Sequence, residues 1–335
     1  MRTKTVSLSC ILFIVLSCTK SNAPDVQKVN AASEDGLRNT AISTPLNDLG
    51  KNKYMDSVGG LYPGGSNNAS GTYAIDLRKT CTSIVPIDTF GNPSDTGNIL
   101  FLSIGGSTGG HNMQMLRTKT LGNSATNPKL KLLNGNNGSG EGSLNSIAKP
   151  NAPYWDHVSQ SLTAVRSSYR QVQVIYLETE DSSMTVSWPE RPQEVKALLE
   201  TALRNIKLKF KNIKIVYVLG RTRTFDVIAT WNHEPCPYYF GWACKWAIQD
   251  QINGKPGTKY KGKNAVAPML AWGFYQWADS TPRKTDGFYW RASETADGLH
   301  ATAIGQDTLS NRFQQFLLTD KFASAWYANH GALNK

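Results

Sequence analysis

The sequence has few cysteines, and none is spaced as in a structural zinc site. There are five cysteines and five histidines among 335 residues. No two cysteines follow the Cys-x2-Cys pattern beside a pair of histidines, which is the arrangement typical of four-coordinate zinc sites. We therefore expect neither a metal ion nor another cofactor.

Long apolar runs are also missing. The longest covers residues 6–16 and is shorter than the roughly 20 residues that a membrane-spanning helix needs. Arg2 and Lys4 precede this run, so the N-terminus has the positive and apolar regions of a secretory signal. We expect export, and no transmembrane helix elsewhere in the chain.

The apolar run ends in Val15-Leu16-Ser17-Cys18, which resembles a lipobox. In a lipobox the cysteine is lipidated and becomes the new N-terminus. We therefore predict a signal peptide over residues 1–17. The lipid on Cys18 would anchor the protein to the bacterial cell envelope, facing the periplasm or the cell surface. The alternative is an ordinary signal peptide that is cut a few residues later, near Ala23.

Residues 18–55 contain many Ser, Asn, Asp, Thr and Lys residues and few large apolar ones. Such a segment buries too little surface to offset the entropy lost on ordering. We predict that residues 18–55 are a disordered tether and that residues 56–335 form one folded domain. Its length is normal for an α/β enzyme.

The formal net charge is +11, but the basic residues do not form a nucleic-acid-binding pattern. They lack interleaved stacking aromatics and a recognisable binding module. We expect no nucleic acid partner, and interpret the lysines as solvated faces attracted to anionic envelope surfaces. The two main groups are Lys207, Lys209, Lys211 and Lys214 near a predicted helix end, and Lys255, Lys259, Lys261 and Lys263 in a predicted loop.

Cys81, Cys236 and Cys244 remain after the N-terminal segment. Export permits disulfides, and Cys236 lies only eight residues before Cys244. We predict a disulfide between Cys236 and Cys244, which would leave Cys81 without a partner. Buried thiols are the alternative.

Short apolar runs alternate with segments of helical spacing through the body of the chain. This alternation predicts an α/β fold: a three-layer α/β/α sandwich with a mainly parallel, flavodoxin-like sheet. Ligands of such folds bind beyond the C-terminal ends of the strands, so the loops that follow the strands should converge. The predicted strands are 98–104, 129–133, 171–177 and 212–219, and the predicted helices are 155–169, 194–210, 241–252 and 302–317.

Two motifs contain residues that suit nucleophilic catalysis. Ser107 lies in a glycine-rich turn (GGSTGG) after the first strand, where a hydroxyl and nearby backbone N–H groups can be exposed. Asp297 stands three residues before His300 (DGLH), a spacing that lets a carboxylate orient an imidazole. Alone, each has an ordinary alternative: a simple turn, and a capping or core histidine.

Taken together and in this order, the motifs resemble those of the SGNH (GDSL-like) hydrolases. The likeness extends to a subgroup of secreted bacterial SGNH-like lipoproteins and covers about residues 54 to 327. It includes GGLYPGGSN (59–67), IVPID (84–88), LSIGGS (102–107), Arg221, KWAIQDQING (245–254), AWGFYQWA (271–278) and DGLH (297–300).

The resemblance implies a role for each motif residue. Ser107 would attack an ester carbonyl, His300 would act as general base and then general acid, and Asp297 would orient His300. The oxyanion hole would use the backbone N–H groups of Ser107 and Gly138 and the side chain at position 181.

At position 181 the chain departs from the family, because Asp181 stands where the relatives have asparagine. An ionised carboxylate repels an oxyanion, and loss of one donor typically lowers kcat by about 10²–10³. Two features could restore a donor. Glu178 and Glu180 could raise the pKa of Asp181 so that a protonated carboxyl donates, or Thr108 could supply the donor.

Further residues are candidates for substrate contacts. Thr108 and Arg221 are predicted to bind substrate, and Arg223 is either a second such contact or a surface ion pair. His111, His157, His233 and His330 are interpreted as structural or exposed. Aromatic residues suit stacking on sugar rings or, alternatively, core packing: Trp231, Tyr238, Tyr239, Trp242, Trp246, Trp272, Tyr275, Trp277 and Trp290.

We therefore expect a monomeric serine esterase that acts on an ester or glycan substrate, removing acyl groups from carbohydrate at the cell envelope. The alternative is a catalytically impaired lipoprotein of the same fold that binds carbohydrate. The carboxylate of Asp181 favours the alternative, and the three motif residues favour the enzyme.

Overall fold

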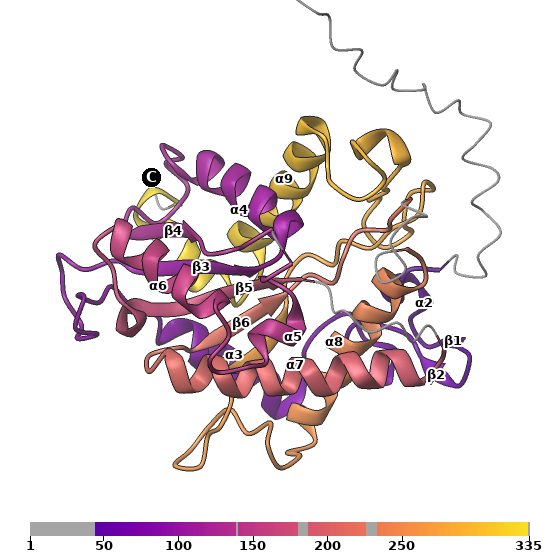
Figure 1. The fold of residues 1–335 in the computed structure, drawn as a ribbon, viewed down its shortest axis with the longest axis horizontal. Helices are drawn as coiled ribbons and strands as arrows, with labels where there is room; N and C mark the ends of the chain where they lie inside the picture. The colour runs from indigo at the N-terminus through magenta and orange to yellow at the C-terminus, as the bar shows by residue number, and fades with distance from the viewer. Residues whose placement is uncertain (1–43, 139, 180–186, 226–232, 334–335) are drawn as a thin grey trace, which may run out of the picture. The chain divides into compact units, whose positions relative to one another are not determined.

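Five parallel strands form the centre of the fold in the computed structural model, which describes residues 44–138, 140–179, 187–225 and 233–333. Their order across the sheet is β4-β3-β5-β6-β7 (Figure 1). The strands are β3 (Ile99–Gly105), β4 (Leu130–Asn134), β5 (Val172–Glu178), β6 (Ile215–Val218) and β7 (Met269–Trp272).

Every residue of β3 and of β5 is buried. A parallel strand that is covered on both faces needs apolar side chains on both, so its sequence is a continuous apolar run. This explains why ILFLSIG and VQVIYLE are recognisable as strands. In the register, Leu102 of β3 lies opposite Ile175 of β5 on one side and Leu133 of β4 on the other.

Helices cover both faces of the sheet (Figure 1). On one face α4 packs against α9, and on the other α7 packs against α8. No helix in the described part of the chain is both long and apolar enough to cross a membrane. The longer helices are α3 (Gly71–Thr82), α4 (Ser107–Thr120), α6 (Tyr154–Ala164), α7 (Glu190–Lys209), α8 (Cys236–Ile252) and α9 (Ala303–Thr319).

Short elements complete the described residues. A two-stranded antiparallel ribbon of β1 and β2 follows α2, and the remaining short helices lie in connections and near the C-terminus. They are α2 (Leu46–Leu49), β1 (Lys53–Tyr54), β2 (Ser57–Val58), η2 (Pro63–Gly65), α5 (Leu144–Ile147), η3 (Tyr169–Gln171), η4 (Ala292–Glu294), α10 (Ser324–Tyr327) and α11 (His330–Leu333).

The strand order confirms the predicted α/β sandwich with a flavodoxin-like sheet. Along the chain, β4 is added on one side of β3, and then β5, β6 and β7 are added on the other side. The crossover direction therefore reverses between β3 and β5. In doubly wound sheets, the crevice beyond the carboxyl ends of such a strand pair is where ligands bind.

Among the strands of the five-stranded sheet and the longer helices, the sequence missed three. The apolar run of β7 is only four residues long and merges into an aromatic segment. Helix α3 buries just three spaced side chains, Tyr73, Leu77 and Cys81, so its helical pattern is weak. Helix α4 contains Gly109 and Gly110, which are poor helix formers. A side chain at Gly110 would come within 3.2 Å of Asn136 Cβ, so glycine lets α4 lie close to the loop after β4.

The predicted boundary between tether and domain is wrong. Leu46 has no exposed surface, and Leu49 is also part of the hydrophobic core. Asp48 accepts hydrogen bonds from the backbone of Lys284 and Thr285. The folded body therefore includes residues before 56. Residues 1–43, with the predicted signal peptide and Cys18, lie outside the described residues.

The predicted disulfide between Cys236 and Cys244 is also wrong. Both residues lie in α8, where eight residues rise by about 12 Å. The Cα atoms of a disulfide are about 4.4–6.8 Å apart, so one helix cannot join these two thiols. Burial raises the pKa of the Cys244 thiol far above its usual range and that of Cys81 to about 12.

Candidate active site

The turn between β3 and α4 places Ser107 at the carboxyl edge of the sheet. Gly105 has a φ of 135°, and a Cβ there would lie 1.7 Å from the carbonyl oxygen of Glu178, at the end of β5. Gly106 donates its N–H to that same carbonyl at 3.2 Å. The chain can make this turn only with glycine at 105, and Ser107 then begins α4.

The three predicted catalytic residues lie together. Ser107 Oγ is 2.8 Å from His300 Nε2, and His300 Nδ1 is 2.7 Å from Asp297 Oδ2. The His300 side chain is about one-third exposed, at 32%, so the imidazole remains accessible from solvent. These contacts run from hydroxyl to imidazole to carboxylate, the order needed to remove a proton from the serine.

The turn that carries Asp297 and His300 is held by its own backbone. Asp297 Oδ1 accepts the N–H of Leu299 at 3.0 Å and of His300 at 2.7 Å. Ala296 donates its N–H to His300 O at 2.7 Å. Partial burial opposes ionisation of Asp297, but the bonds from His300 and Leu299 outweigh it and lower its pKa. The carboxylate therefore stays charged and can stabilise an imidazolium.

Two of the three predicted oxyanion-hole positions lie beside the nucleophile. Ser107 is the first residue of α4, so its N–H is one of the first-turn donors without a partner inside the helix. A Cβ built on Gly138 would be 3.1 Å from Ser107 Cβ and 4.0 Å from Ser107 Oγ. Asp181, the third position, lies outside the described residues, as does Glu180.

Buried hydrogen bonds tie the loop of Ser107 to the loop of Gly138. Tyr154 at the start of α6 has no exposed surface. Its hydroxyl accepts the N–H of Gly105 at 2.9 Å and donates to Gly135 O at 3.0 Å. Burial raises the pKa of Tyr154 well above its usual range, so the hydroxyl keeps its proton.

Asn136 makes a second link between the same loops. Its side-chain Nδ2 donates to Gly106 O at 2.9 Å, and its backbone carbonyl oxygen lies 2.9 Å from His157 Nε2. The relative position of Ser107 and Gly138 is therefore set by side chains of α6 and of the loop after β4.

Glu178, which was predicted to raise the pKa of Asp181, lies in the interior beside the turn that carries Ser107. Only 1% of its surface is exposed, and its Oε2 accepts Asn112 Nδ2 at 3.0 Å and the Tyr176 hydroxyl. Burial raises the pKa of Glu178, although Gln276, Asn112 and Arg221 favour the charged form. The carboxyl therefore holds the first turns of α4 against β5.

Of the predicted substrate contacts, Arg221 is buried and Thr108 is half-buried. The hydroxyl of Thr108 lies in the interior beside Glu178, and Arg221 is 3% exposed. The charge of Arg221 favours ionisation of two buried carboxyls, those of Glu178 and Glu234. The Thr108 hydroxyl and the Arg221 side chain are thus both enclosed by protein in this structure.

Arg223 is not a surface pair. It is 5% exposed and pairs with Asp279. The next residues reach the catalytic turn, because the N–H of Phe225 donates to Gly298 O at 2.7 Å. The segment after β6 thus connects a buried charge cluster to the turn of Asp297 and His300.

Glu234 is the most strongly perturbed carboxyl of this cluster. Its Oε1 accepts the N–H of Thr224 at 3.2 Å and Trp277 Nε1 at 3.0 Å. Its Oε2 is buried and has no hydrogen-bond partner among the residues that the structure describes. Burial raises the pKa of Glu234 to about 7, despite the opposing charges of Arg223 and Arg221.

Most of the aromatic side chains that were candidates for sugar stacking belong to the core. Trp242, Trp277 and Trp290 have no exposed surface. Trp246 is only partly buried, and Trp231 lies outside the described residues. The others are at most 5% exposed: Tyr238, Tyr239, Trp272 and Tyr275. They form no stacking platform at the site.

His111 is a neighbour of the site that sequence reasoning missed. Its ring centre is 5.8 Å from that of His300. Loss of solvent and then the nearby His300 lower the pKa of His111. The spacing of four residues from Ser107 was the available signal, since such pairs share a helix face. Within the described ranges, no group of three or more His, Cys, Asp or Glu side chains could hold a metal ion.

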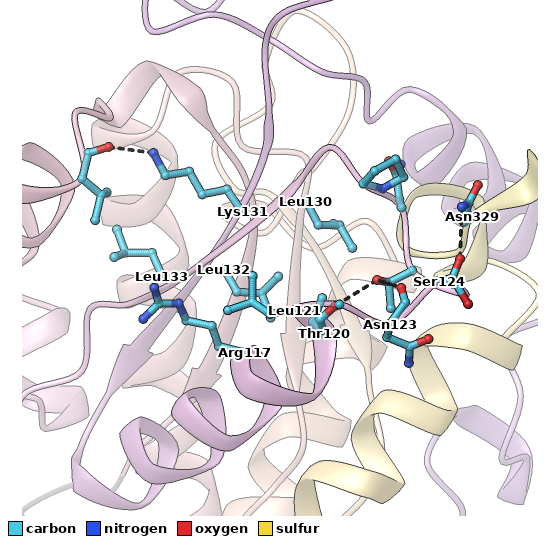
Figure 2. A pocket seen from close by; sticks show the side chains of 15 residues that line it. Arg117, Thr120, Leu121, Asn123, Ser124, Leu130, Lys131, Leu132, Leu133 and Asn329 are labelled. Carbon is cyan, nitrogen blue, oxygen red and sulfur yellow. Dashed lines mark hydrogen bonds between the residues drawn. The ribbon is translucent and has the colours of Figure 1, made fainter. Parts of the chain in front are cut away.

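Figure 2 shows a cavity of about 440 Å³ that is lined by β4 and by the C-terminal end of α4. Ser107, Asp297 and His300 do not line it. Its one lysine, Lys131, already donates to Val165 O at 2.6 Å and to Ser167 Oγ at 3.0 Å. This cavity is therefore separate from Ser107, Asp297 and His300, and its lysine is already bonded, while Arg117 also lines it.

Comparison with known proteins shows no close relative. No family model matches the chain, and no curated protein is similar to it. Eight chains of solved structures match, among them a crystal structure of a "putative acylhydrolase" from Bacteroides fragilis NCTC 9343. It is 10% identical, with a TM-score of 0.36, and the match covers 74% of this chain and 97% of that chain. So distant a likeness carries no argument about function.

Removal of the Tyr154 hydroxyl should slow the reaction of Ser107. Tyr154→Phe leaves Gly105 N–H without its partner and frees the loop of Gly138, so an oxyanion donor shifts. We expect the rate constant for labelling Ser107 with a fluorophosphonate to fall about tenfold, since loss of a whole donor costs about 10²–10³. Tyr327→Phe is the matched control, because it removes a buried hydroxyl that bonds Thr120 away from the site. Equal slowing in both variants would contradict a positioning role.

Glu234 should make stability depend on pH. With its pKa raised to about 7, Glu234 holds its proton up to about that pH in the folded chain, whereas in the unfolded chain it loses the proton near its ordinary pKa of 4.5. Between these values the folded state binds more protons, so its stability falls as pH rises. The Tm of Glu234→Gln minus that of the wild type should therefore grow from pH 5 to pH 8, by roughly 2 °C or more. The exposed Asp56→Asn should show no such trend, and a constant difference for Glu234→Gln would refute the inference.

Proposed function

We propose that this chain is a serine esterase of the SGNH hydrolase type. The observation that carries the proposal is the hydrogen-bonded series Ser107, His300 and Asp297, with distances of 2.8 and 2.7 Å. These residues come from two turns that are 190 residues apart and meet at the carboxyl edge of the sheet. A capping or core histidine would not need an accessible ring between a serine and a carboxylate.

The geometry supports a two-step reaction. His300 Nε2 takes the proton of Ser107 as its oxygen attacks the ester carbonyl, and the imidazolium then protonates the leaving alkoxide. Water repeats the sequence on the acyl-enzyme, which releases the carboxylic acid and restores Ser107. The N–H groups of Ser107 and Gly138 stabilise the negative oxygen, aided by the N-terminal end of α4.

The substrate and the location are the finer parts of the proposal. An acyl group on carbohydrate at the cell envelope remains the predicted substrate, although the buried aromatics give it no stacking platform. Lipidation of Cys18 would hold the enzyme there. Fatty-acid labelling tests this, and label that persists in Cys18→Ser would overturn it.

A second candidate function is carbohydrate binding without catalysis. The observation that favours it is Asp181, a carboxylate at a position where the relatives have an asparagine donor. In the described part of the chain, however, the nucleophile, the base and the orienting carboxylate are all in contact. That arrangement has no evident use in a purely binding protein.

Ser107→Ala should abolish ester hydrolysis. With the nucleophile removed, kcat for p-nitrophenyl acetate should fall by about 10³ or more. Ser70→Ala is the control, because Ser70 is exposed and its side chain caps no helix. Equal rates for the wild type and Ser107→Ala would exclude Ser107 as the nucleophile. No hydrolysis by the wild type, together with glycan binding, would favour the second candidate.

A further inference from the structure

Five lysines line one cavity at the opposite end of the sheet from Ser107. The cavity measures about 510 Å³ and lies between α3, the C-terminal end of α7 and the segment before β7. The lysines come from three separate parts of the sequence: Lys79, Lys207, Lys211, Lys214 and Lys261. The sequence alone showed only two of these groups, as runs along the chain.

The cavity has one carboxylate, and that carboxylate is already engaged. Asp76 accepts a hydrogen bond from Tyr260 at 2.8 Å and forms an ion pair with Lys261. Lys79, Lys207, Lys211 and Lys214 form no ion pair within the described ranges. Burial, and then the charges of Lys214 and Lys211, lower the pKa of Lys207. The lining of the cavity therefore carries more positive than negative charge.

Another group of lysines is neutralised by carboxylates. Lys196 and Lys255 lie 2.7 and 2.8 Å from Asp250, and Glu200 adds a second carboxylate to this group. Favourable helix dipoles account for part of the lysine cavity, because Lys79 and Lys207 stand in the last turns of α3 and α7. Lys261 pairs with Asp76, but Lys211 and Lys214 lie outside helices and form no ion pair within the described ranges, so they need another explanation.

Exposed apolar side chains occur on the segments that form the lysine cavity. Nine large hydrophobic residues are exposed in the described part of the chain. Three of these are direct sequence neighbours of a lining residue, and a fourth, Val85, stands two residues after the lining residue Ser83. A fifth, Phe90, is 71% exposed, and its neighbour Gly91 accepts a hydrogen bond from the lining residue Asn212. The three direct neighbours are Ile75, Leu208 and Val266.

We propose that this lysine cavity and the exposed apolar side chains of the same segments dock on an anionic phospholipid bilayer. The ammonium groups would contact headgroup phosphates, each lysine near such a surface adding to the attraction. The apolar side chains would enter the boundary between headgroups and acyl chains. A soluble phosphate ligand would account for the lysines alone and would leave the exposed apolar residues without a role.

The orientation that follows suits an enzyme of the cell envelope. Lys214 directly precedes β6, whereas Ser107 follows β3, and the two strands run in parallel. The lysine cavity and the catalytic residues therefore lie at opposite ends of the sheet. A chain docked through the lysines would turn Ser107 away from the bilayer. The docking proposal does not depend on the esterase activity or on lipidation of Cys18.

Vesicle flotation tests the proposal. The chain from residue 19 onward lacks Cys18 but keeps the entire described core, which begins at Leu46. It should bind vesicles of phosphatidylcholine with 25% phosphatidylglycerol, and bind vesicles of pure phosphatidylcholine far less. The variant with Lys79, Lys207, Lys211 and Lys214 all changed to Gln should bind the anionic vesicles about 100-fold more weakly.

The matched control removes the same charge elsewhere. Lys51, Lys53, Lys149 and Lys284 are exposed and do not line the cavity, so their change to Gln should weaken binding less than about tenfold. Equal loss in both variants would show that only net charge matters and would overturn the proposal. Both variants should hydrolyse p-nitrophenyl acetate like the wild type, which separates this result from a failure of the esterase assignment.

Two further measurements identify the bilayer as the partner. Leu208→Ser should reduce binding to anionic vesicles even in 0.5 M NaCl, where lysine contacts are screened, while it leaves the charge unchanged. Inorganic phosphate at 10 mM should not release the bound protein. Release by phosphate, together with no effect of Leu208→Ser, would instead assign the cavity to a soluble phosphate ligand and would overturn the bilayer proposal.

Discussion

The close approach of Gly105 to the carbonyl oxygen of Glu178 is the constraint on which the site depends. A side chain at 105 would overlap that oxygen, and the N–H of Gly106 bonds to it. The end of β3 is thereby fixed to the end of β5, where the crossover direction reverses, and α4 must start there. Since α4 packs against α9, the turn before α9 brings His300 within 2.8 Å of Ser107. One backbone contact thus helps to bring together the proposed nucleophile and the proposed base, which are far apart in sequence.

The sequence predicted what depends on local pattern. The fully buried strands β3 and β5 were recognisable because their apolar runs are continuous, and Ser107, Asp297 and His300 because their turns are short and distinctive. Residues that act over long distances in sequence were not recognisable. Tyr154 is an ordinary aromatic at a helix start, and only the fold shows its hydroxyl between Gly105 and Gly135. The prediction of a disulfide between Cys236 and Cys244 was wrong because one continuous helix holds the two residues apart.

A cluster of buried charged side chains lies next to the candidate active site. Glu178 and Glu234 both lose solvent, and Arg221 partly compensates both. Such groups are costly to bury and are stabilised only by well-placed partners. The cluster is also connected to the surface, since Phe225 N–H bonds to Gly298 O in the catalytic turn. The segment that carries Arg221 and Arg223 is thus joined by its backbone to the turn of Asp297 and His300.

The direction of the strands and helices places the candidate active site and the lysine cavity at opposite ends of the sheet. In a parallel βα arrangement each helix runs back against the strands, so α4 has its N-terminus at the carboxyl edge and α7 has its C-terminus at the other. Helix N-termini favour negative charge and C-termini favour positive charge. An oxyanion at Ser107 and lysines beyond Lys207 are therefore each placed where the backbone stabilises them. Exchanging the two would set an oxyanion against helix C-termini and an ammonium cluster against helix N-termini, and the helix dipoles would oppose both placements. The chain connectivity, more than any single motif, thus determines which end of this sheet can stabilise negative charge and which can bind an anionic surface.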